Sequence, residues 1–370
     1  MKKKILIISH DFVKKVNIRI YEELNKKKNL EIICVRPKKL FLNGKYISKD
    51  FNKENSSIKI LEKKTIFKSL RFLYFKDIFH VIDNFKPSHV IIHNDPVSLQ
   101  TILVIIISFF KNFSISCISN ENKILKFFNN FELLSFFRSL FLFSFNLFIK
   151  NRLKYIFCIT KQIKKNYDFL GYKNKTVLMP LGFDQNIFKK KKRKKNKKFI
   201  ISYFGRISEE KGVHVLIKSL KQVDFEFKFY LDVSHIDNIK YFRKILKELK
   251  KTIHSSKIKY INCDHNKIAN YMRKSDLVVL PSLYEEQYGR VIQESVACGS
   301  LVIGSRSGAI PEIINDKDLL FIKNDHHELS NKINRLKNRN FFKIKLKNQY
   351  IKILKKRTLT KQLEILNKLF

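Results

Sequence analysis

Two glutamates in the second half of the chain, Glu286 and Glu294, are separated by seven residues. The Val/Leu-rich segment 276–280, bounded by a proline, is typical of a buried parallel strand. A loop through Gly289 follows, then a helix, and residues 301–303 form the next predicted strand. This order places Glu286 at the carboxyl edge of a parallel sheet, where ligands of open α/β sheets bind. The alternative is a pair of solvated glutamates around an ordinary helix start, because acidic first turns are common.

A second group of residues, earlier in the chain, is suited to binding phosphate. Residues 199–204 form a predicted strand, Gly205 and Arg206 form a turn, and Lys211 stands at the start of an amphipathic helix. A helix N-terminus offers free N–H groups and partial positive charge, and the two cations add full charges. We expect both cations to reach a diphosphate. The alternative is that two of the many basic residues stand here by chance.

The two groups together resemble motifs of the retaining glycosyltransferases of family 4, which have the GT-B fold. The matching segments are E-x7-E at 286–294, G-R-x4-K-G at 205–212, the loop at 304–312, and P-L-G-F-D at 180–184. In the loop, Ala309 replaces the second glycine of the family pattern. The resemblance covers residues 175–315 well, and the N-terminal half only by its α/β pattern.

The resemblance implies a role for each matching residue. Glu286 would contact hydroxyls of the transferred sugar and Glu294 the ribose of the nucleotide, because carboxylates accept hydrogen bonds from pairs of hydroxyls. Arg206 and Lys211 would neutralise the leaving diphosphate, so Glu286, Arg206 and Lys211 are the predicted catalytic residues. The other predicted donor-binding residues are Gly205, Tyr288, Gly289 and Ser307. The resemblance implies no cofactor and no metal, since the nucleotide-sugar is a substrate.

Length and pattern predict two α/β domains. The chain has 370 residues, and strand-like segments alternate with helical ones along it. Further predicted strands are 4–9, 30–35, 89–93, 113–119, 155–160, 227–233 and 258–263. The predicted fold class is α/β, a GT-B fold in which two Rossmann-like domains with parallel sheets face each other across a cleft. We expect an N-terminal acceptor-side domain at 1–188, completed by a C-terminal helix within 355–370, and a nucleotide-sugar-binding domain at 199–354. The basic segment 189–198 is predicted to be an exposed linker.

Acceptor-side candidates lie at predicted strand ends in the N-terminal half. Many family members carry a histidine after the strand that here is 113–119, and this chain has Asn120 and Glu121 instead. Either residue takes over the contact to the sugar or the acceptor, or the enzyme belongs to a branch that uses another group. Asp95 is either an acceptor-side acid or the N-cap of the next helix, with a proline at its first position. His10 follows the first strand at the same edge.

Composition weighs against other classes of protein. The formal net charge is +44, but the basic residues are spread along the chain, and no nucleic-acid-binding motif of defined spacing is present. The charge accompanies many Phe, Ile and Asn residues, a bias that AT-rich codons explain. Five separated cysteines without a C-x2-C pair favour buried thiols in a reducing compartment. Cys263 and His265 lack the further ligands that a metal site needs.

Three apolar segments bear on membrane association. The run at 5–8 stops too early for a signal peptide, and the run at 101–110 is too short to span a bilayer. Residues 133–149, nearly apolar all round, are interpreted as a buried or interface-lying helix. We therefore expect a cytoplasmic protein, with peripheral association at the anionic inner face of the membrane as a further expectation.

The expected reaction is transfer of a hexose from a nucleotide-sugar to a glycan or lipid-linked acceptor, with retention and without a metal ion. Cell-surface polysaccharide or lipopolysaccharide synthesis is the expected setting. Two alternatives stay open. One is a non-catalytic or epimerase-type GT-B protein that binds nucleotide-sugars, and the other is a basic nucleic-acid-binding protein.

Overall fold

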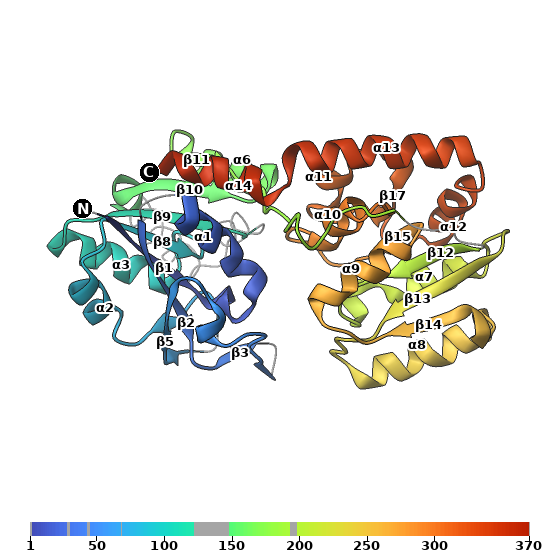
Figure 1. The fold of residues 1–370 in the computed structure, drawn as a ribbon, viewed down its shortest axis with the longest axis horizontal. Coiled ribbons are helices and arrows are strands. Elements are labelled where there is room, and N and C mark those ends of the chain that lie inside the picture. Colours follow the sequence, from blue (N-terminus) through green and yellow to red (C-terminus); the bar gives the residue numbers. More distant parts are fainter. Residues whose placement is uncertain are drawn as a thin grey trace, which may run out of the picture. The chain divides into compact units, whose positions relative to one another are not determined.

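The computed structural model describes residues 2–27, 30–42, 45–67, 69–121, 148–192 and 198–369. Its contacts divide the chain into two compact units: unit 1 is Met1–Pro180 with Gln362–Phe370, and unit 2 is Leu181–Lys361. Each unit contains one large parallel sheet accompanied by helices (Figure 1). The predicted α/β fold class with two parallel sheets is confirmed.

The sheet of unit 1 has seven strands in the order β11-β10-β9-β8-β1-β2-β5, and all of its neighbouring pairs are parallel. The strands are β1 (Lys3–Ser9), β2 (Leu30–Pro37), β5 (Lys59–Lys63), β8 (His89–His93), β9 (Ser114–Ser119), β10 (Leu153–Cys158) and β11 (Thr176–Leu178). Strand β1 lies in the middle, and Ile5, Leu6 and Ile7 are fully buried. Burial of successive residues means that both faces of this strand are covered, as is usual in parallel sheets.

Shorter elements complete unit 1. Two antiparallel pairs follow β2 and β5: β3 (Leu40–Leu42) with β4 (Lys45–Ile47), and β6 (Thr65–Ile66) with β7 (Tyr74–Phe75). The α-helices among the described residues are α1 (Lys15–Lys27), α2 (Ile78–Phe85), α3 (Leu99–Phe110), α6 (Lys161–Tyr167) and, at the C-terminal end, α14 (Leu359–Leu366). Leu363 and Leu366 of α14 are buried, and the residues from Gln362 onward belong to unit 1.

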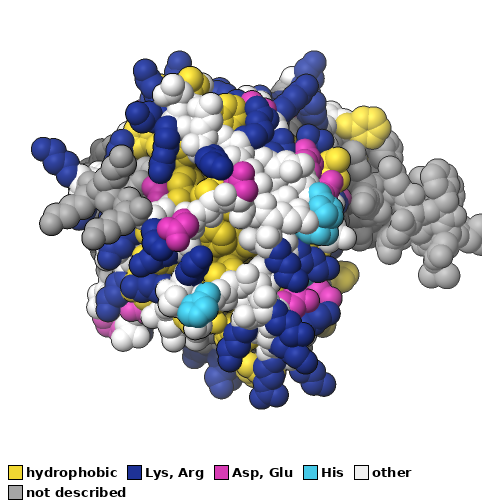
Figure 2. Space-filling view, turned by 90° about the vertical axis from the view of Figure 1, so that its right-hand side faces the viewer, with side chains coloured by type: hydrophobic (Ala, Val, Ile, Leu, Met, Phe, Trp, Pro, Cys, Tyr) yellow, Lys and Arg dark blue, Asp and Glu magenta, His cyan; other side chains and the backbone are white. Residues whose placement is uncertain are grey.

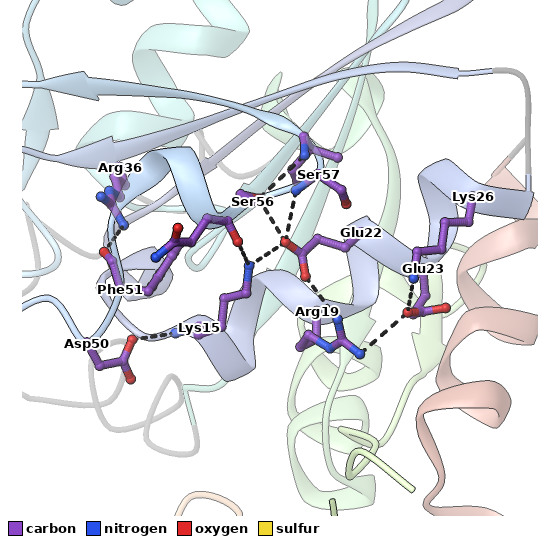
Figure 3. Close-up of polar contacts among 12 residues, drawn as sticks. Lys15, Arg19, Glu22, Glu23, Lys26, Arg36, Asp50, Phe51, Ser56 and Ser57 are labelled. Atoms are coloured by element: carbon purple, nitrogen blue, oxygen red, sulfur yellow. Dashed lines mark hydrogen bonds and ion pairs between the residues drawn. The ribbon is translucent and has the colours of Figure 1, made fainter. Parts of the chain in front are cut away.

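A buried carboxylate, Glu22 of helix α1, binds Ser56 and Ser57 in the segment before β5 (Figure 3). Lys15 donates to it at 2.5 Å and the Ser56 hydroxyl at 2.8 Å, and Arg19 lies 3.3 Å away. Burial alone would raise the pKa of Glu22, but the hydrogen bonds from Lys15 and Ser56 outweigh burial and lower it. The ionised carboxylate thus joins α1 to the segment before β5.

The sheet of unit 2 has six strands in the order β14-β13-β12-β15-β16-β17, again with every neighbouring pair parallel. The strands are β12 (Phe199–Tyr203), β13 (Phe227–Asp232), β14 (Ile258–Ile261), β15 (Leu277–Leu280), β16 (Leu301–Ser305) and β17 (Leu320–Phe321). The order reverses between β12 and β15. This is the topological switch point at which open α/β sheets bind ligands.

Seven described α-helices lie entirely within unit 2: α7 (Val213–Leu220), α8 (Ile239–Thr252), α9 (His265–Lys274), α10 (Arg290–Ala297), α11 (Ile310–Ile314), α12 (His326–Arg335) and α13 (Arg339–Lys356). Helix α7 buries the predicted apolar positions Val213, Leu216, Ile217 and Leu220. Gln349 of α13 accepts from the Val302 N–H at 2.9 Å and donates to its C=O at 3.0 Å, which anchors α13 to β16.

The division of the chain differs from the expected boundary. The sequence placed it in the basic segment 189–198, whereas the units divide after Pro180. Phe183 and Phe188 explain the difference, because both are buried in the hydrophobic core of unit 2. The described residues of the basic segment, 189–192 and 198, are exposed or half-buried.

Two expectations concern the cysteines and the membrane. All five cysteines are free; four are buried and Cys263 is half-buried. Among the described helices, none is long and apolar enough to cross a bilayer. The apolar segment predicted at 133–149 lies, except for its last two residues, outside the described residues.

Candidate active site

Three loops at the carboxyl ends of β12, β15 and β16 form the candidate site in unit 2. The three strands are neighbours in the sheet, with β15 in the middle. Hydrogen bonds join the loops: Leu283 N–H donates to Glu210 C=O at 2.8 Å, and Ala309 N–H donates to Glu286 C=O at 2.8 Å. The Ser305 hydroxyl also donates to Ser282 C=O at 2.6 Å. The loops are therefore held as one body at the switch point.

Two glycines permit this close contact. Gly212 has φ +68°, and a Cβ there would lie 2.0 Å from the Pro281 carbonyl oxygen. Gly308 has φ +53°, and its Cβ would lie 2.2 Å from the Glu286 carbonyl oxygen. Any side chain at either position would collide with backbone and would adopt a left-handed conformation that L-residues disfavour. The glycines of the two motif loops are required by the contact between the loops.

Glu286 is the centre of a compact polar cluster. Lys211 Nζ donates to Glu286 Oε1 at 2.5 Å, and the Ser282 hydroxyl donates to the same oxygen at 3.1 Å. Tyr284 donates its hydroxyl to Glu286 Oε2. The exposed fractions of the Lys211 and Glu286 side chains are 15% and 8%, so the ion pair is largely shielded from water.

Tyr284 contacts both charged partners. Its oxygen lies 2.9 Å from Lys211 Nζ, and its ring centroid lies 4.6 Å from the same ammonium. Burial, followed by the charge of the adjacent Glu286, raises the pKa of Tyr284 well above its ordinary value. The tyrosine therefore keeps its proton and remains a hydrogen-bond donor to the carboxylate.

Arg206 lies in the turn after β12, which the fold holds in place. Gly205, with φ +138°, donates its N–H to Asp232 at 3.3 Å, and the Tyr203 hydroxyl donates to Arg206 C=O at 2.6 Å. The guanidinium donates to Asp237 at 2.7 Å and to Glu210 at 3.2 Å. Its side chain is 40% exposed, so a ligand can approach it.

Glu294 lies on α10, the helix that follows the Glu286 loop. Gly289, with φ +74°, precedes the first residue of α10, and Gly299, with φ +93°, follows its last turn. Glu294 itself is only 3% exposed. Ser307 is also buried, and its hydroxyl donates to Tyr284 C=O. Ser307 thus fixes the loop that carries Tyr284 and Glu286.

Tyr288 has the contacts of a structural residue, in contrast to the donor-binding role that the motif implied. Its hydroxyl donates to Leu181 C=O at 2.6 Å, lies 3.2 Å from Gln293 Oε1, and accepts from Arg357 at 2.9 Å. The side chain is 5% exposed. These partners tie the Glu286 loop to the two ends of unit 2.

The sequence interpretation missed Tyr284, Ser282 and the carboxylates Asp237 and Glu210. Tyr284 and Ser282 stand two and four residues before Glu286, so a search for hydroxyl groups in the same loop could have found them. Asp237 follows β13, and nothing in the local sequence indicates that it meets Arg206.

The acceptor-side candidates occupy the carboxyl edge of the unit 1 sheet, and Arg71 joins two of them. Its guanidinium lies 3.2 Å from Glu121 and 3.9 Å from Asp95. Burial raises the pKa of Asp95 to about 6, although Arg71 opposes the rise. A carboxyl group that titrates near neutral pH is suited to proton transfer. Arg71 was not predicted, because it comes from the loop between β6 and β7.

The N-cap alternative for Asp95 is wrong. Helix α3 begins at Leu99, and Ser98 is its N-cap, with a side chain that accepts from Thr101 N–H. Asp95 Oδ1 accepts from Val97 N–H at 3.1 Å in the turn before the helix.

The other two acceptor-side candidates, His10 and Asn120, also follow strands of the unit 1 sheet. His10, in the turn after β1, is buried and lies 3.3 Å from the Asp11 carboxylate. Asn120 is half-buried directly after β9. Among the described residues there is no group of three or more His, Cys, Asp or Glu side chains placed to hold a metal ion.

Lys and Arg side chains are scattered over the face of the molecule shown in Figure 2, with Asp and Glu side chains between them. They form no single stripe on this face, in agreement with the even spread of basic residues in the sequence.

Comparison with known proteins adds independent information on unit 2. Residues 184–357 match the family of glycosyl transferases group 1. The chain is 29% identical over 184 residues to the uncharacterized glycosyltransferase MJ1178 of Methanocaldococcus jannaschii, covering 48% of each protein. It is 29% identical over 125 residues to a lipopolysaccharide 1,2-N-acetylglucosaminetransferase of Salmonella typhimurium, covering 32% of each. The chain thus spans about half or less of the length of these curated relatives.

Among solved structures, Anabaena HepE in complex with UDP-glucose superposes with a TM-score of 0.72 at 16% identity. The alignment covers 99% of both chains, so the likeness in fold extends over both units. The chain has the GT-B fold, and its residues 184–357 match the family model of glycosyl transferases group 1.

Proposed function

We propose that this protein is a retaining glycosyltransferase that moves a hexose from a nucleotide-sugar to a glycan or lipid-linked acceptor. The observation that carries the proposal is the pair formed by Lys211 and Glu286 at the switch point of unit 2. A cation suited to a diphosphate and a carboxylate suited to sugar hydroxyls stand side by side there. That is the chemistry a nucleotide-sugar presents at its glycosidic phosphate.

The proposed donor site assigns one ligand group to each side chain. Lys211 and Arg206 bind the diphosphate, Glu286 orients the sugar, and Glu294 holds the ribose. The two cations stabilise the charge that develops as the diphosphate leaves, so the reaction as proposed requires no metal ion. Fixed loops supply these groups in position, which lowers the entropic cost of reaching the transition state.

The proposed bond changes take place on one face of the sugar. The bond from the anomeric carbon to the phosphate oxygen breaks, and a new bond to the acceptor oxygen forms on the same side. The proton of the acceptor hydroxyl passes to the leaving diphosphate oxygen, so charge and atoms balance. Asp95, Asn120, Glu121 and His10 remain the candidates for orienting the acceptor.

The proposed setting is the synthesis of cell-surface polysaccharide or lipopolysaccharide, at the cytoplasmic face of the membrane. The name of the Salmonella relative supports this setting, and the UDP-glucose in the HepE structure makes UDP-sugars the first donors to test. The high positive charge favours contact with anionic lipid headgroups.

The experiment is a thermal-stability screen of the full chain with UDP-, GDP- and ADP-sugars. A ligand that binds only the folded state raises the melting temperature. The stabilising donor is then incubated with the protein and analysed for hydrolysis and for transfer to sugar acceptors. Release of an epimerised nucleotide-sugar would assign an epimerase instead, and binding without turnover would assign a non-catalytic relative. If no nucleotide-sugar stabilises the protein, the proposal fails.

A further inference from the structure

The two cations assigned to the diphosphate are already paired with carboxylates. Lys211 pairs with Glu286 at 2.5 Å, and Arg206 pairs with Asp237 at 2.7 Å and Glu210 at 3.2 Å. Two cations therefore face three carboxylates before a diphosphate adds its own negative charge. A diphosphate that binds here has to compete with these carboxylates.

The three carboxylates differ in how easily they can release a cation. The side chains of Glu210 and Asp237 are 47% and 20% exposed, so water can solvate them when Arg206 turns to a ligand. The Glu286 side chain is 8% exposed. A buried carboxylate that loses its counterion is costly unless new hydrogen-bond donors replace it. Of the three carboxylates, Glu286 thus most needs new hydrogen-bond donors when its cation leaves.

Two hydroxyl groups remain with Glu286 if Lys211 leaves. Tyr284 donates to Oε2 and Ser282 donates to Oε1 at 3.1 Å. Tyr284 also presents its ring to the ammonium at 4.6 Å, a contact that does not depend on Glu286. The hydroxyls of a bound sugar would add donors to the carboxylate oxygens. Hydroxyl groups, rather than a second cation, can then satisfy the carboxylate.

We propose that Lys211 exchanges partners when the donor binds: the diphosphate replaces Glu286 as its counterion, and the sugar hydroxyls replace Lys211 on Glu286. Tyr284 is the positioning residue, since it contacts both the Glu286 carboxylate and the Lys211 ammonium. The proposal rests on the proposed function and adds a means of discrimination. When a nucleoside diphosphate without a sugar binds Lys211, Glu286 loses its counterion and gains no new hydrogen-bond donor. When a nucleotide-sugar binds, the sugar hydroxyls donate hydrogen bonds to Glu286.

Calorimetry on the full chain tests the exchange. UDP, GDP and ADP are titrated first, and the one that binds wild-type protein most tightly is the probe. Glu286→Gln removes the competing charge and keeps the side-chain volume, so the probe should bind about tenfold more tightly, the equivalent of one charge-assisted hydrogen bond. Glu285→Gln is the matched control, because it removes the same charge from an exposed position in the same loop. The control should bind the probe like wild type.

A second variant separates positioning from folding. Tyr284→Phe keeps the ring beside Lys211 and removes only the hydroxyl. The exchange predicts that this variant loses affinity for the bare diphosphate about threefold or more, because one of the two hydroxyl groups that stay with Glu286 is gone. Its affinity for the nucleotide-sugar stays within about twofold of wild type, because the sugar hydroxyls replace the missing donor. If Tyr284 had a merely structural role, the variant would lose affinity for both ligands to the same extent.

The outcomes are distinct. Equal affinity of wild type, Glu286→Gln and Glu285→Gln for the diphosphate would overturn the exchange and leave the proposed function standing. Equal losses for both ligands in Tyr284→Phe would also overturn it. If none of the three nucleoside diphosphates binds wild-type protein, the proposed function itself fails.

Discussion

Lys211 Nζ lies 2.5 Å from Glu286 Oε1, although the two residues are 75 positions apart in the chain. One comes from the turn after β12 and the other from the loop after β15, and these strands are neighbours at the switch point. The contact turns two sequence motifs into one site. It also changes an expectation: if Glu286 met only the sugar, its charge would not affect the binding of a free nucleoside diphosphate.

Lys211→Ala should weaken the binding of the nucleotide-sugar and of the free nucleoside diphosphate, because both lose a charge-assisted contact. The expected loss is about 1.5–3 kcal/mol for each ligand, measured by calorimetry. Lys218→Ala is the control, since Lys218 is an exposed cation on α7. An unchanged diphosphate affinity in a folded Lys211→Ala protein would remove Lys211 from the site.

Arg206→Lys should also reduce donor affinity, even though it conserves the charge. The guanidinium donates from two different nitrogens, here to Asp237 and Glu210, and the same fork can bind two phosphate oxygens at once, which a lysine ammonium cannot reproduce. We expect a loss of about 1 kcal/mol or more in calorimetry with the nucleoside diphosphate. Wild-type affinity in Arg206→Lys would mean that only the net charge matters at this position.

Glu294→Gln should weaken the binding of the free nucleotide, because a neutral amide accepts a weaker hydrogen bond from the ribose than a carboxylate does. The change keeps the side-chain volume of this buried residue, and the expected loss is about 1–2 kcal/mol. The melting temperature of the variant without ligand serves as the folding control. If the variant folds normally and binds the nucleotide as wild type does, Glu294 has no part in ribose recognition.

Much of this site was accessible from the sequence, because local pattern decides it. Strand β8 has the predicted bounds, and β12 and β15 differ from prediction by one residue at one end. Near the ends of β12 and β15, a short apolar run stops at a glycine or a proline, and that local pattern determines the element by itself. The motif spacing then assigned Glu286 and Lys211 to loops at the same sheet edge.

The partners of these residues were not accessible in the same way. Only the tertiary fold brings Tyr284, Arg71 and Glu22 to their partners. The hydrophobic periodicity of the sequence does not predict which charged side chains form pairs. The start of α3 shows a local ambiguity. Both Asp95 and Ser98 are good N-caps, and the structure uses Ser98 while Asp95 stabilises the preceding turn.

Buried His89 should make unit 1 less stable in acid. Burial lowers the pKa of His89 from 6.5 to about 3, so the unfolded chain binds a proton that the folded chain excludes. Stability therefore falls as the pH drops below about 6.5, by at most about 1.4 kcal/mol per pH unit. Hydrogen exchange of β8 peptides at pH 7, 6 and 5 measures this slope.

The matched variant for that measurement is His89→Asn, which can still meet the Ser114 hydroxyl but does not titrate. Its protection at β8 should change less with pH than that of wild type. Parallel pH profiles for the two proteins would show that His89 is not the source of the acid sensitivity.

The turnover of a nucleotide-sugar by wild type and by Glu286→Gln tests the central claim most directly. The donor identified by thermal stabilisation is incubated with each protein, and release of the nucleoside diphosphate is followed with and without sugar acceptors. The account predicts slow hydrolysis or transfer by wild type and a loss of about 100-fold or more in Glu286→Gln, the scale of a removed transition-state contact. Glu285→Gln should turn over the donor like wild type. Equal turnover by wild type and Glu286→Gln would contradict the account.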